Sequence, residues 1–344
     1  MWYNGCNDFL EKNMKLYTAN GNKVFNILEQ ENHAPADWIK LKISMVYPTL
    51  ADVSVYGGKL DIDYPRVPCR MATAVVSEDR PEYGLKLGSR VLLNPYVNPN
   101  LDEEECYTDV EVYGIHKDGF LRDFVSMPID NIIPFPEDVK EDEAIFADIV
   151  AVALRIINAL KPSKGDYIAL IGGSLLMNVT AQLALYYQAI PIVITADRRY
   201  LELAEDCGVY YTIDENREDV AKKVFSITGG RMADHTVQHA LPNVTPNFIY
   251  SLCARGGDCI VASLNNLCIP RQEVDIGLVA SKNLYVRGVC CGLQEYNSAV
   301  NVLAQKIINF GGFIDKTVPI GEAKELFDEL SNDYARYQCA IIRV

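Results

Sequence analysis

The sequence lacks an excess of basic residues. Its 32 lysines and arginines stand against 46 aspartates and glutamates, which gives the 344-residue chain a formal net charge of −14. Nucleic acids and anionic membranes bind through clusters of positive charge, so we expect neither as a partner. The chain also lacks an apolar run of the roughly 20 residues that a bilayer-spanning helix needs. Its start, MWYNGCNDFLEKN, has no signal-peptide pattern. We therefore expect a cytoplasmic protein that acts on a small molecule.

Paired cysteine motifs are missing as well. The ten cysteines are scattered and no C-x-x-C occurs, which is typical of reduced thiols in an intracellular protein. We interpret them as small buried side chains rather than as disulfides or zinc ligands. They are Cys6, Cys69, Cys106, Cys207, Cys253, Cys259, Cys268, Cys290, Cys291 and Cys339.

The residue pattern changes near residue 145. Before it, β-branched runs such as WIKLKISMVYP and SRVLLNPYVNP end at proline or glycine, which predicts short strands joined by turns. After it, the helical run EAIFADIVAVALRIINAL precedes strands and helices in alternation, beginning with IALIGG and LLMNVTAQLALYYQ. Such alternation predicts a doubly wound parallel sheet. The segment from 295 onward, with two amphipathic helices and a last strand, is assigned back to the first domain.

Several landmarks follow one another in a characteristic order. KLGSRVLLNP, KPSKGDYIALIGG, TGGRMADHTVQHAL, ARGGDCIVAS and VPIGEAKELFDEL together resemble the zinc-type alcohol dehydrogenase family of medium-chain dehydrogenases/reductases, from about Ile39 to the end. The absence of a four-cysteine lobe, together with DGFLRDFV, is most similar to the ribulose-5-phosphate reductase branch.

The resemblance implies an α/β fold built from two domains. A GroES-like β-rich domain over 1–147 and 295–344 would carry the substrate site. A Rossmann domain, with a doubly wound parallel sheet, would bind the dinucleotide over 148–294. The resemblance also implies an isologous homodimer formed through the strand LYVRGVCCG.

The family's catalytic zinc requires a Cys, a His and a third Cys, Glu or Asp. The resemblance places the first ligand at Tyr47 or Thr49, depending on a two-residue shift, the second at Arg70 and the third at Asp148. A guanidinium cannot deprotonate to bind a metal and would repel it, which leaves Asp148 as the one retained candidate. We predict no catalytic zinc and no structural zinc.

Two interpretations of Arg70 stay open. In the first, Arg70 forms a buried salt bridge with Asp148 that fills the vacated metal site. In the second, Arg70 binds a substrate oxygen bidentately in place of a Lewis acid, and Asp148 orients it. The two interpretations are compatible.

Three further groups are candidates for proton transfer: Thr49, Tyr47 and His116. His116 lies in GIHKDG, a pattern that also suits a plain loop residue. An alternative zinc site made from Cys69, Asp148 and His116 would require three rearrangements at once.

The glycine fingerprint G-x-G-x-x-G is incomplete. Gly172 matches the first glycine, whereas Ser174 and Met177 occupy the second and third positions. Ser174 is small enough to donate to a phosphate, but Met177 is harder to place where the helix should pack closely on the strand. The helix N-terminus remains an anion site. We expect a cofactor to bind at Gly172, Gly173, Ser174 and Leu175.

The residues at the end of the next strand indicate whether NAD or NADP is the cofactor. NAD-binding relatives carry an acidic residue there, but this chain has Thr195, followed by Asp197, Arg198 and Arg199. A missing acid and two arginines suit the 2′-phosphate of NADP. Two alternatives remain: the arginines line a solvated helix start, or Asp197 serves the ribose of NAD.

These features support three hypotheses on function. The first is a zinc-independent NAD(P)H-dependent oxidoreductase that acts on a polar carbonyl or alcohol compound, such as a phosphorylated polyol or ketose. The second is a metal-free enoyl or iminium reductase, because conjugate or iminium reduction needs no metal. The third is a catalytically inactive relative that serves as a structural or regulatory subunit.

Overall fold

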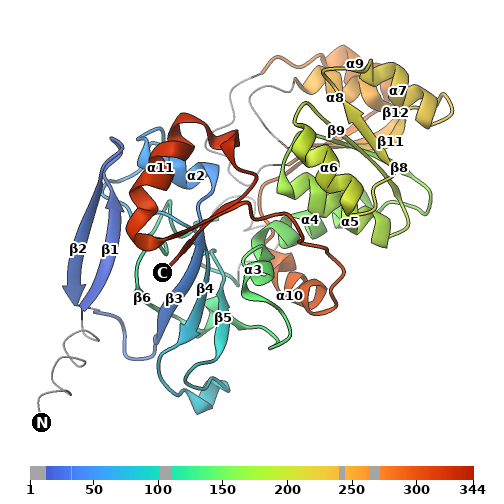
Figure 1. The fold of residues 1–344 in the computed structure, drawn as a ribbon. Helices are drawn as coiled ribbons and strands as arrows, with labels where there is room; N and C mark the ends of the chain where they lie inside the picture. The colour runs from blue at the N-terminus through green and yellow to red at the C-terminus, as the bar shows by residue number, and fades with distance from the viewer. Residues whose placement is uncertain (1–12, 32, 101–109, 240–244, 263–271) are drawn as a thin grey trace, which may run out of the picture. The chain divides into compact units, whose positions relative to one another are not determined.

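The computed structural model describes residues 13–31, 33–100, 110–239, 245–262 and 272–344 (Figure 1). The chain forms two compact units, Met1–Asp148 with Ile314–Val344 and Ile149–Phe313. Cys6, Cys106 and Cys268 of the sequence analysis lie outside the described residues. Within those residues, no helix combines the length and the apolar character needed to cross a membrane.

A mostly antiparallel sheet forms the centre of the first unit. Its strand order is β14-β15-β3-β4-β5-β7, with β6 paired to β3, and only β14 and β15 run parallel. In β3, residues Ile39, Leu41 and Ile43 alternate with more exposed positions and are fully buried, as expected for a strand with one face on the core. The strands are β3 (Ile39–Tyr47), β4 (Met71–Val76), β5 (Arg90–Leu93), β6 (Phe124–Met127), β7 (Ile132–Pro134), β14 (Lys316–Pro319) and β15 (Ala340–Arg343).

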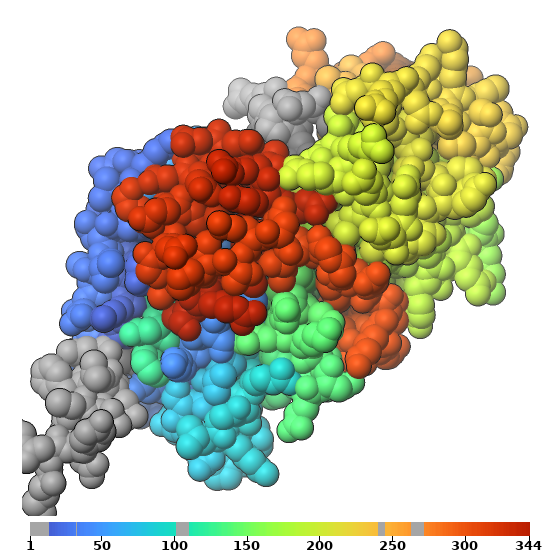
Figure 2. All heavy atoms as spheres, in the orientation of Figure 1, coloured from blue at the N-terminus to red at the C-terminus, as the bar shows by residue number. Residues whose placement is uncertain are grey.

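A hairpin that the sequence analysis did not predict precedes this sheet. β1 (Asn13–Ala19) pairs with β2 (Phe25–Glu31) in an antiparallel two-stranded sheet. The helices of this unit are α2 (Leu50–Tyr56), α3 (Glu141–Ala144) and α11 (Ala323–Asn332). α11 packs against α2, and β15 pairs with β3, so the two ends of the chain share one unit; Figure 2 shows red C-terminal atoms beside blue N-terminal ones.

Six parallel strands among the described residues form the sheet of the second unit, in the order β10-β9-β8-β11-β12-β13. The runs YIALI and IPIVIT are apolar throughout because a parallel sheet is covered on both faces. The predicted α/β fold class, with a doubly wound parallel sheet, is confirmed. The strands are β8 (Tyr167–Ile171), β9 (Ile190–Thr195), β10 (Tyr211–Asp214), β11 (Ala233–His239), β12 (Cys253–Ala262) and β13 (Tyr285–Val289).

The helices of the second unit alternate with these strands (Figure 1). They are α4 (Ala147–Leu160, which starts at the boundary of the first unit), α5 (Leu175–Tyr186), α6 (Arg198–Asp206), α7 (Val220–Ile227), α8 (Pro246–Leu252), α9 (Ile276–Lys282) and α10 (Tyr296–Ala304).

The second unit extends to Phe313, whereas the sequence analysis placed its end at residue 294. Two contacts account for the longer unit. Gln182 of α5 exchanges hydrogen bonds with the backbone of Asn309, at 3.1 and 2.7 Å. Gly292 lies so close to Ala151 of α4 that an added Cβ would stand 2.5 Å from the Ala151 carbonyl carbon. Both contacts hold the segment through α10 against helices of the second unit.

Candidate functional site

The first predicted ligand position lies where β3 meets α2. Tyr47 is the last residue of β3, and Thr49 is the N-cap residue of α2. The backbone N–H and the hydroxyl of Thr49 donate to Asp52 Oδ2 at 2.7 and 2.6 Å. This reciprocal capping box fixes the start of the helix. It also directs the Thr49 hydroxyl at a carboxylate.

Asp52 is a buried carboxylate that the sequence analysis missed. Its side chain is inaccessible to solvent, and the backbone N–H of Cys69 donates to Oδ1 at 2.7 Å. Burial raises the pKa of Asp52, while hydrogen bonds from Thr49 and Cys69 and the charge of Arg70 oppose that rise. The T-x-x-D spacing of a capping box was the signal that could have found it.

The backbone conformation at Cys69 directs its N–H at Asp52. Cys69 has a φ of +70°, in the left-handed region that residues other than glycine rarely adopt. Gly114, with a φ of +86°, covers the same turn; a Cβ there would stand 3.3 Å from Asp52 Oδ1 and 3.2 Å from the Arg70 nitrogen. The two loops therefore enclose the carboxylate tightly.

The structure brings Arg70 and Asp148 together. Arg70 Nη2 donates to Asp148 Oδ2, and the Tyr96 hydroxyl donates to Asp148 Oδ1 at 2.9 Å. The two charged side chains are 5% and 1% exposed. Burial opposes the charge of Arg70, but the charge of Asp148, with smaller contributions from Tyr96 and Asp52, raises its pKa. Arg70 is therefore a permanently charged partner of Asp148.

The other two proton-transfer candidates have different surroundings. The Tyr47 ring packs edge-on against Phe146, with 6.0 Å between ring centroids, and its hydroxyl is hydrogen-bonded to Tyr334. His116 is exposed, and its Nδ1 accepts a hydrogen bond from the Val112 N–H at 3.0 Å. The His116 ring thus closes its own loop, whereas Tyr47 belongs to a buried aromatic contact.

The glycine loop of the second unit joins β8 to α5. Gly172 has a φ of +110°, and Ser174 is the N-cap residue of α5, where its hydroxyl oxygen accepts from the Met177 N–H at 3.3 Å. The first-turn N–H groups of a helix have no acceptor within the helix, so the start of α5 suits an anion. Leu175 opens this helix and is buried.

Met177, at the altered third position of the fingerprint, is buried, and Gly173 of the glycine loop is tightly enclosed. Met177 is 1% exposed and α5 packs against β8 and β9. Gly173 is enclosed: a Cβ there would stand 2.7 Å from Thr195 Oγ1 and 2.8 Å from Tyr200 Cδ2. The loop passes so close to the end of β9 that Gly173 has no room for a side chain.

The residues after β9 are already paired. The buried Thr195 hydroxyl oxygen accepts from the Asp197 N–H at 3.1 Å. Arg199 holds Asp197 bidentately, with Nη2–Oδ2 at 2.6 Å and Nε–Oδ1 at 3.1 Å. Burial raises the pKa of Asp197, but the hydrogen bonds and charge of Arg199 bring it below its ordinary value. Arg198 pairs with Glu202 at 2.9 Å on the exposed side of α6.

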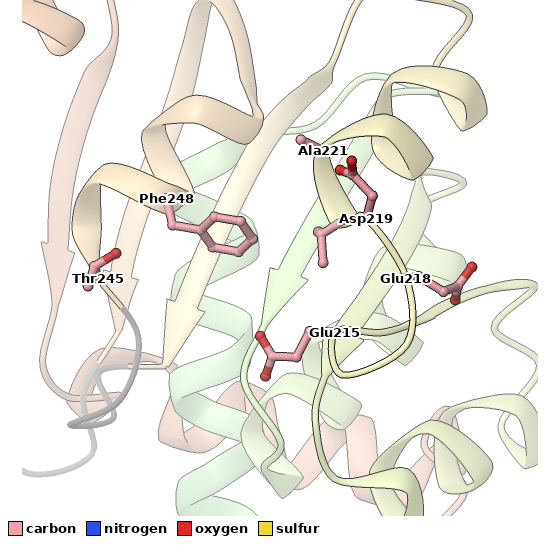
Figure 3. Close-up of a pocket in the computed structure, with 7 residues that line it drawn as sticks. Glu215, Glu218, Asp219, Ala221, Thr245 and Phe248 are labelled. Atoms are coloured by element: carbon pink, nitrogen blue, oxygen red, sulfur yellow. The ribbon is translucent and has the colours of Figure 1, made fainter.

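A pocket of about 460 Å³ opens beside the carboxyl end of β10 (Figure 3). Glu215 and the Phe248 ring face it, while the Glu218 carboxylate points away (Figure 3). The Glu215 N–H donates to Thr195 O at 3.3 Å, which connects the pocket rim to the end of β9. Ligands of open α/β sheets bind at the carboxyl ends of the strands. The acidic lining of this pocket suits ligands with hydrogen-bond donors rather than phosphates.

Comparison with known proteins supports the family resemblance. The family model described as zinc-binding dehydrogenase matches residues 178–305. A zinc-type alcohol dehydrogenase-like protein of Haemophilus influenzae is 24% identical over 298 residues, which are 83% of this chain and 86% of that protein. The chain is similar, over most of its length, to the zinc-type alcohol dehydrogenase-like proteins of the medium-chain dehydrogenase/reductase family. The resemblance drawn from the order of sequence landmarks is confirmed.

A further reductase and two solved dehydrogenases are similar to this chain in sequence or fold. Ribulose-5-phosphate reductase of Streptococcus pneumoniae is 29% identical over 220 residues, which are 59% of this chain and 61% of that enzyme. A short chain alcohol dehydrogenase from Escherichia coli CFT073, solved with NADH, superposes with a TM-score of 0.84 at 18% identity, over 97% of this chain and 100% of that one. A zinc-binding dehydrogenase from Sinorhizobium meliloti 1021, bound to NADP, gives 0.83 at 19% identity, over 96% and 99% of the two chains.

The donor set at the predicted ligand positions does not fit a catalytic zinc. Arg70, which the resemblance places at the histidine position, already pairs with Asp148, the one retained ligand candidate. Thr49 directs its hydroxyl at Asp52. Among the described residues, His, Cys, Asp and Glu side chains nowhere gather in a group of three that could hold a metal. Zinc binding at this position would require these contacts to break.

Proposed function

We propose that this chain is a zinc-independent, NAD(P)H-dependent oxidoreductase that acts on the carbonyl or alcohol group of a polar small molecule. One observation supports the proposal: Arg70 and Asp148, which the resemblance places at two zinc-ligand positions, pair with each other, while the glycine loop retains a helix start that suits an anion. When bound, the dinucleotide supplies or accepts the hydride. No step of the proposal requires a metal.

The cofactor site is proposed at the start of α5, with Gly172, Gly173, Ser174 and Leu175 around the pyrophosphate. We propose NADP as the preferred cofactor, with NAD as the alternative. Arg199 is the ligand proposed for the 2′-phosphate because its guanidinium is held by Asp197, two residues after the end of β9. Arg198, which pairs outward with Glu202, is assigned a weaker role.

Thr49 and Asp52 are proposed as the proton-transfer pair. In the oxidation direction, Thr49 Oγ1 accepts the proton of the substrate alcohol and passes its own proton to Asp52 Oδ2, 2.6 Å away. Reduction runs the same transfers in reverse. Burial, which favours the protonated form of Asp52, suits this exchange. Tyr47, through Tyr334, and His116 are the alternative relays.

Arg70 has two roles open in this proposal. As an anchor, its guanidinium would polarise a substrate oxygen, with Asp148 and Tyr96 holding its orientation. The exposed fraction of its side chain, 5%, leaves little surface for that contact and favours the structural role. The same observation supports the second candidate function, a metal-free enoyl or iminium reductase, because such a reaction does not depend on Arg70.

The substrate class and the assembly are also proposals. The likeness to ribulose-5-phosphate reductase supports a phosphorylated polyol or ketose as substrate. In β13, residues Tyr285 to Gly288 are exposed, and α9 has no buried residue, which supports a homodimer that covers both elements. The cytoplasmic location stays a prediction.

Reductase assays on metal-chelated protein test this function. NADPH oxidation is followed with D-ribulose 5-phosphate and with 2-cyclohexen-1-one, which separate carbonyl reduction from conjugate reduction. Thr49→Val should lower kcat by about 10²- to 10⁴-fold without changing the Kd of NADPH, because a general acid–base is lost. Thr49→Ser, which keeps both the hydroxyl and the helix cap, is the matched control. Equal turnover by the Thr49→Val variant and the parent would exclude Thr49 as the relay. Absence of NADPH binding would favour the inactive-subunit hypothesis instead.

A further inference from the structure

Two buried cysteines of the second unit lie against each other at the start of β12. Cys253 and Cys259 are inaccessible to solvent, and their thiols interact directly. With Tyr250 they form a small apolar cluster. Cys253 is the first residue of β12, so this dithiol lies toward the amino end of the parallel sheet. The glycine loop lies at the carboxyl end, and the dithiol is separate from the proposed cofactor site.

A tight turn brings the two cysteines together. Six residues apart in a straight strand, they would be separated by roughly 20 Å. The pairing with β11 shows the interruption: Cys253 is level with Ala233, and Asp258 is level with His235, so the residues between Cys253 and Asp258 leave the ladder. Gly256 turns the chain with a φ of +76°.

The neighbouring glycine fixes the position of one sulfur. A Cβ on Gly257 would stand 2.6 Å from Cys253 Sγ, so a residue with a side chain would displace the thiol. Cys253 Sγ lies 3.7 Å from the carbonyl oxygen of Asp258, the residue before Cys259. The thiol therefore faces the strand that carries its partner.

The surroundings make the two thiols chemically different. The hydrogen bond from Cys253 is the main cause that lowers the pKa of Cys259, and the Lys282 ammonium assists. The same hydrogen bond raises the pKa of Cys253. Lys282 Nζ is held in place by the carbonyl oxygens of Cys253, at 2.8 Å, and Tyr250, at 3.1 Å. Cys259 is thus the thiol of the pair that loses its proton more readily, and the thiolate is the form that attacks disulfides.

We propose that Cys253 and Cys259 form a modification site, a dithiol that a small organic disulfide converts into an intramolecular disulfide. With glutathione disulfide, the Cys259 thiolate attacks one sulfur and expels a glutathione thiolate. Cys253 then gives its proton to that thiolate and attacks the Cys259 sulfur, which expels the second glutathione. The protein loses two electrons and its thiol protons, and one glutathione disulfide becomes two glutathione molecules.

Access to the pair runs through the turn. Arg255 and Gly256 are exposed, and the next residue, Gly257, lies against Cys253 Sγ. The Gly256–Gly257 pair gives this cover more backbone freedom than other residues would. The proposal requires this turn to open far enough for the disulfide to reach Cys259.

Mass spectrometry of the folded protein tests the proposal. The protein is incubated with glutathione disulfide in native buffer, alkylated with N-ethylmaleimide under denaturing conditions and digested with trypsin, which cleaves after Arg255. We expect a disulfide-linked pair of peptides, with fragmentation placing the bond at Cys253 and Cys259. The second peptide also contains Cys268, so a bond assigned to Cys268 would overturn the proposal.

Variants separate closure of this pair from general thiol oxidation. Cys259→Ser should abolish the linked peptides, whereas Cys207→Ser, which removes a half-buried thiol elsewhere in the unit, should leave them at the parent level. Recovery of Cys253 and Cys259 as alkylated thiols, while Cys207 has become glutathionylated, would show that the pair is inert. Glutathione retained on Cys259 without closure would show that the two sulfurs cannot reach each other. Either result overturns the proposal.

Discussion

Arg70 and Asp148 form an ion pair that is almost completely removed from solvent, with side chains 5% and 1% exposed. Tyr96 donates to the second carboxylate oxygen of Asp148 at 2.9 Å, so the pair is hydrogen-bonded on both sides. The family resemblance places two of the three zinc ligands at these positions. The two charges must remain paired because an isolated buried charge is costly.

Removing one partner of this pair should cost far more than removing both. Arg70→Met or Asp148→Leu alone should lower the free energy of unfolding by about 3–5 kcal/mol, because each leaves a buried charge without its partner. The double variant should lie within about 1–2 kcal/mol of the parent. Urea unfolding followed by circular dichroism measures all four proteins. Additive losses in the double variant would contradict the account.

The two arginines at the start of α6 should differ in their effect on cofactor binding. Arg199→Ala should weaken NADPH binding by about 1–3 kcal/mol, the contribution of a charge-assisted hydrogen-bonded pair, and leave NADH binding nearly unchanged. Arg198→Ala is the matched control because Arg198 pairs with Glu202 on the exposed face. Isothermal titration with both cofactors gives the four affinities for each protein. Equal losses for NADPH and NADH would show that Arg199 does not meet the 2′-phosphate.

His239, the last residue of β11, should make the protein sensitive to acid. Burial lowers the pKa of His239 to about 4, whereas in the unfolded chain it is near 6.5. Between these values the unfolded state binds a proton that the folded state does not, so stability is complete above pH 6.5 and falls as the pH drops toward 4. The loss should reach up to about 3 kcal/mol.

Urea unfolding at several pH values tests this titration. His239→Gln should flatten the fall in stability between pH 6.5 and 4. His33→Gln is the matched control, since the His33 side chain is 84% exposed. An unchanged slope in the His239→Gln variant would refute the assignment to this residue.

The second unit could be predicted from the sequence, while parts of the first could not. YIALI and IPIVIT are almost entirely apolar, and helices follow them at regular spacing, so the parallel sheet could be predicted. β2 was missed because nearly all of its residues are exposed, which leaves no alternating pattern. A two-stranded sheet of this kind is defined by its pairing with β1 rather than by burial.

The residue types of the candidate site could be predicted from the sequence, but the contacts between them could not. The sequence predicted that Tyr47 or Thr49 and Arg70 replace two zinc ligands and that Asp148 is the one retained candidate. The role of Asp52 was not, because its third hydrogen bond comes from Cys69, which is 17 residues away. The Asp197–Arg199 pair was also hidden, because a charged run at a helix start does not reveal which side chains meet.

The central claim is that this chain binds its dinucleotide without a metal. Isothermal titration of NADPH into protein dialysed against EDTA, with the zinc content measured by elemental analysis, tests it most directly. The account predicts saturable binding at one site per chain, with zinc far below one per chain and a thermal unfolding midpoint that the chelator does not change. Zinc retained at one per chain, or binding that appears only when zinc is restored, would contradict it.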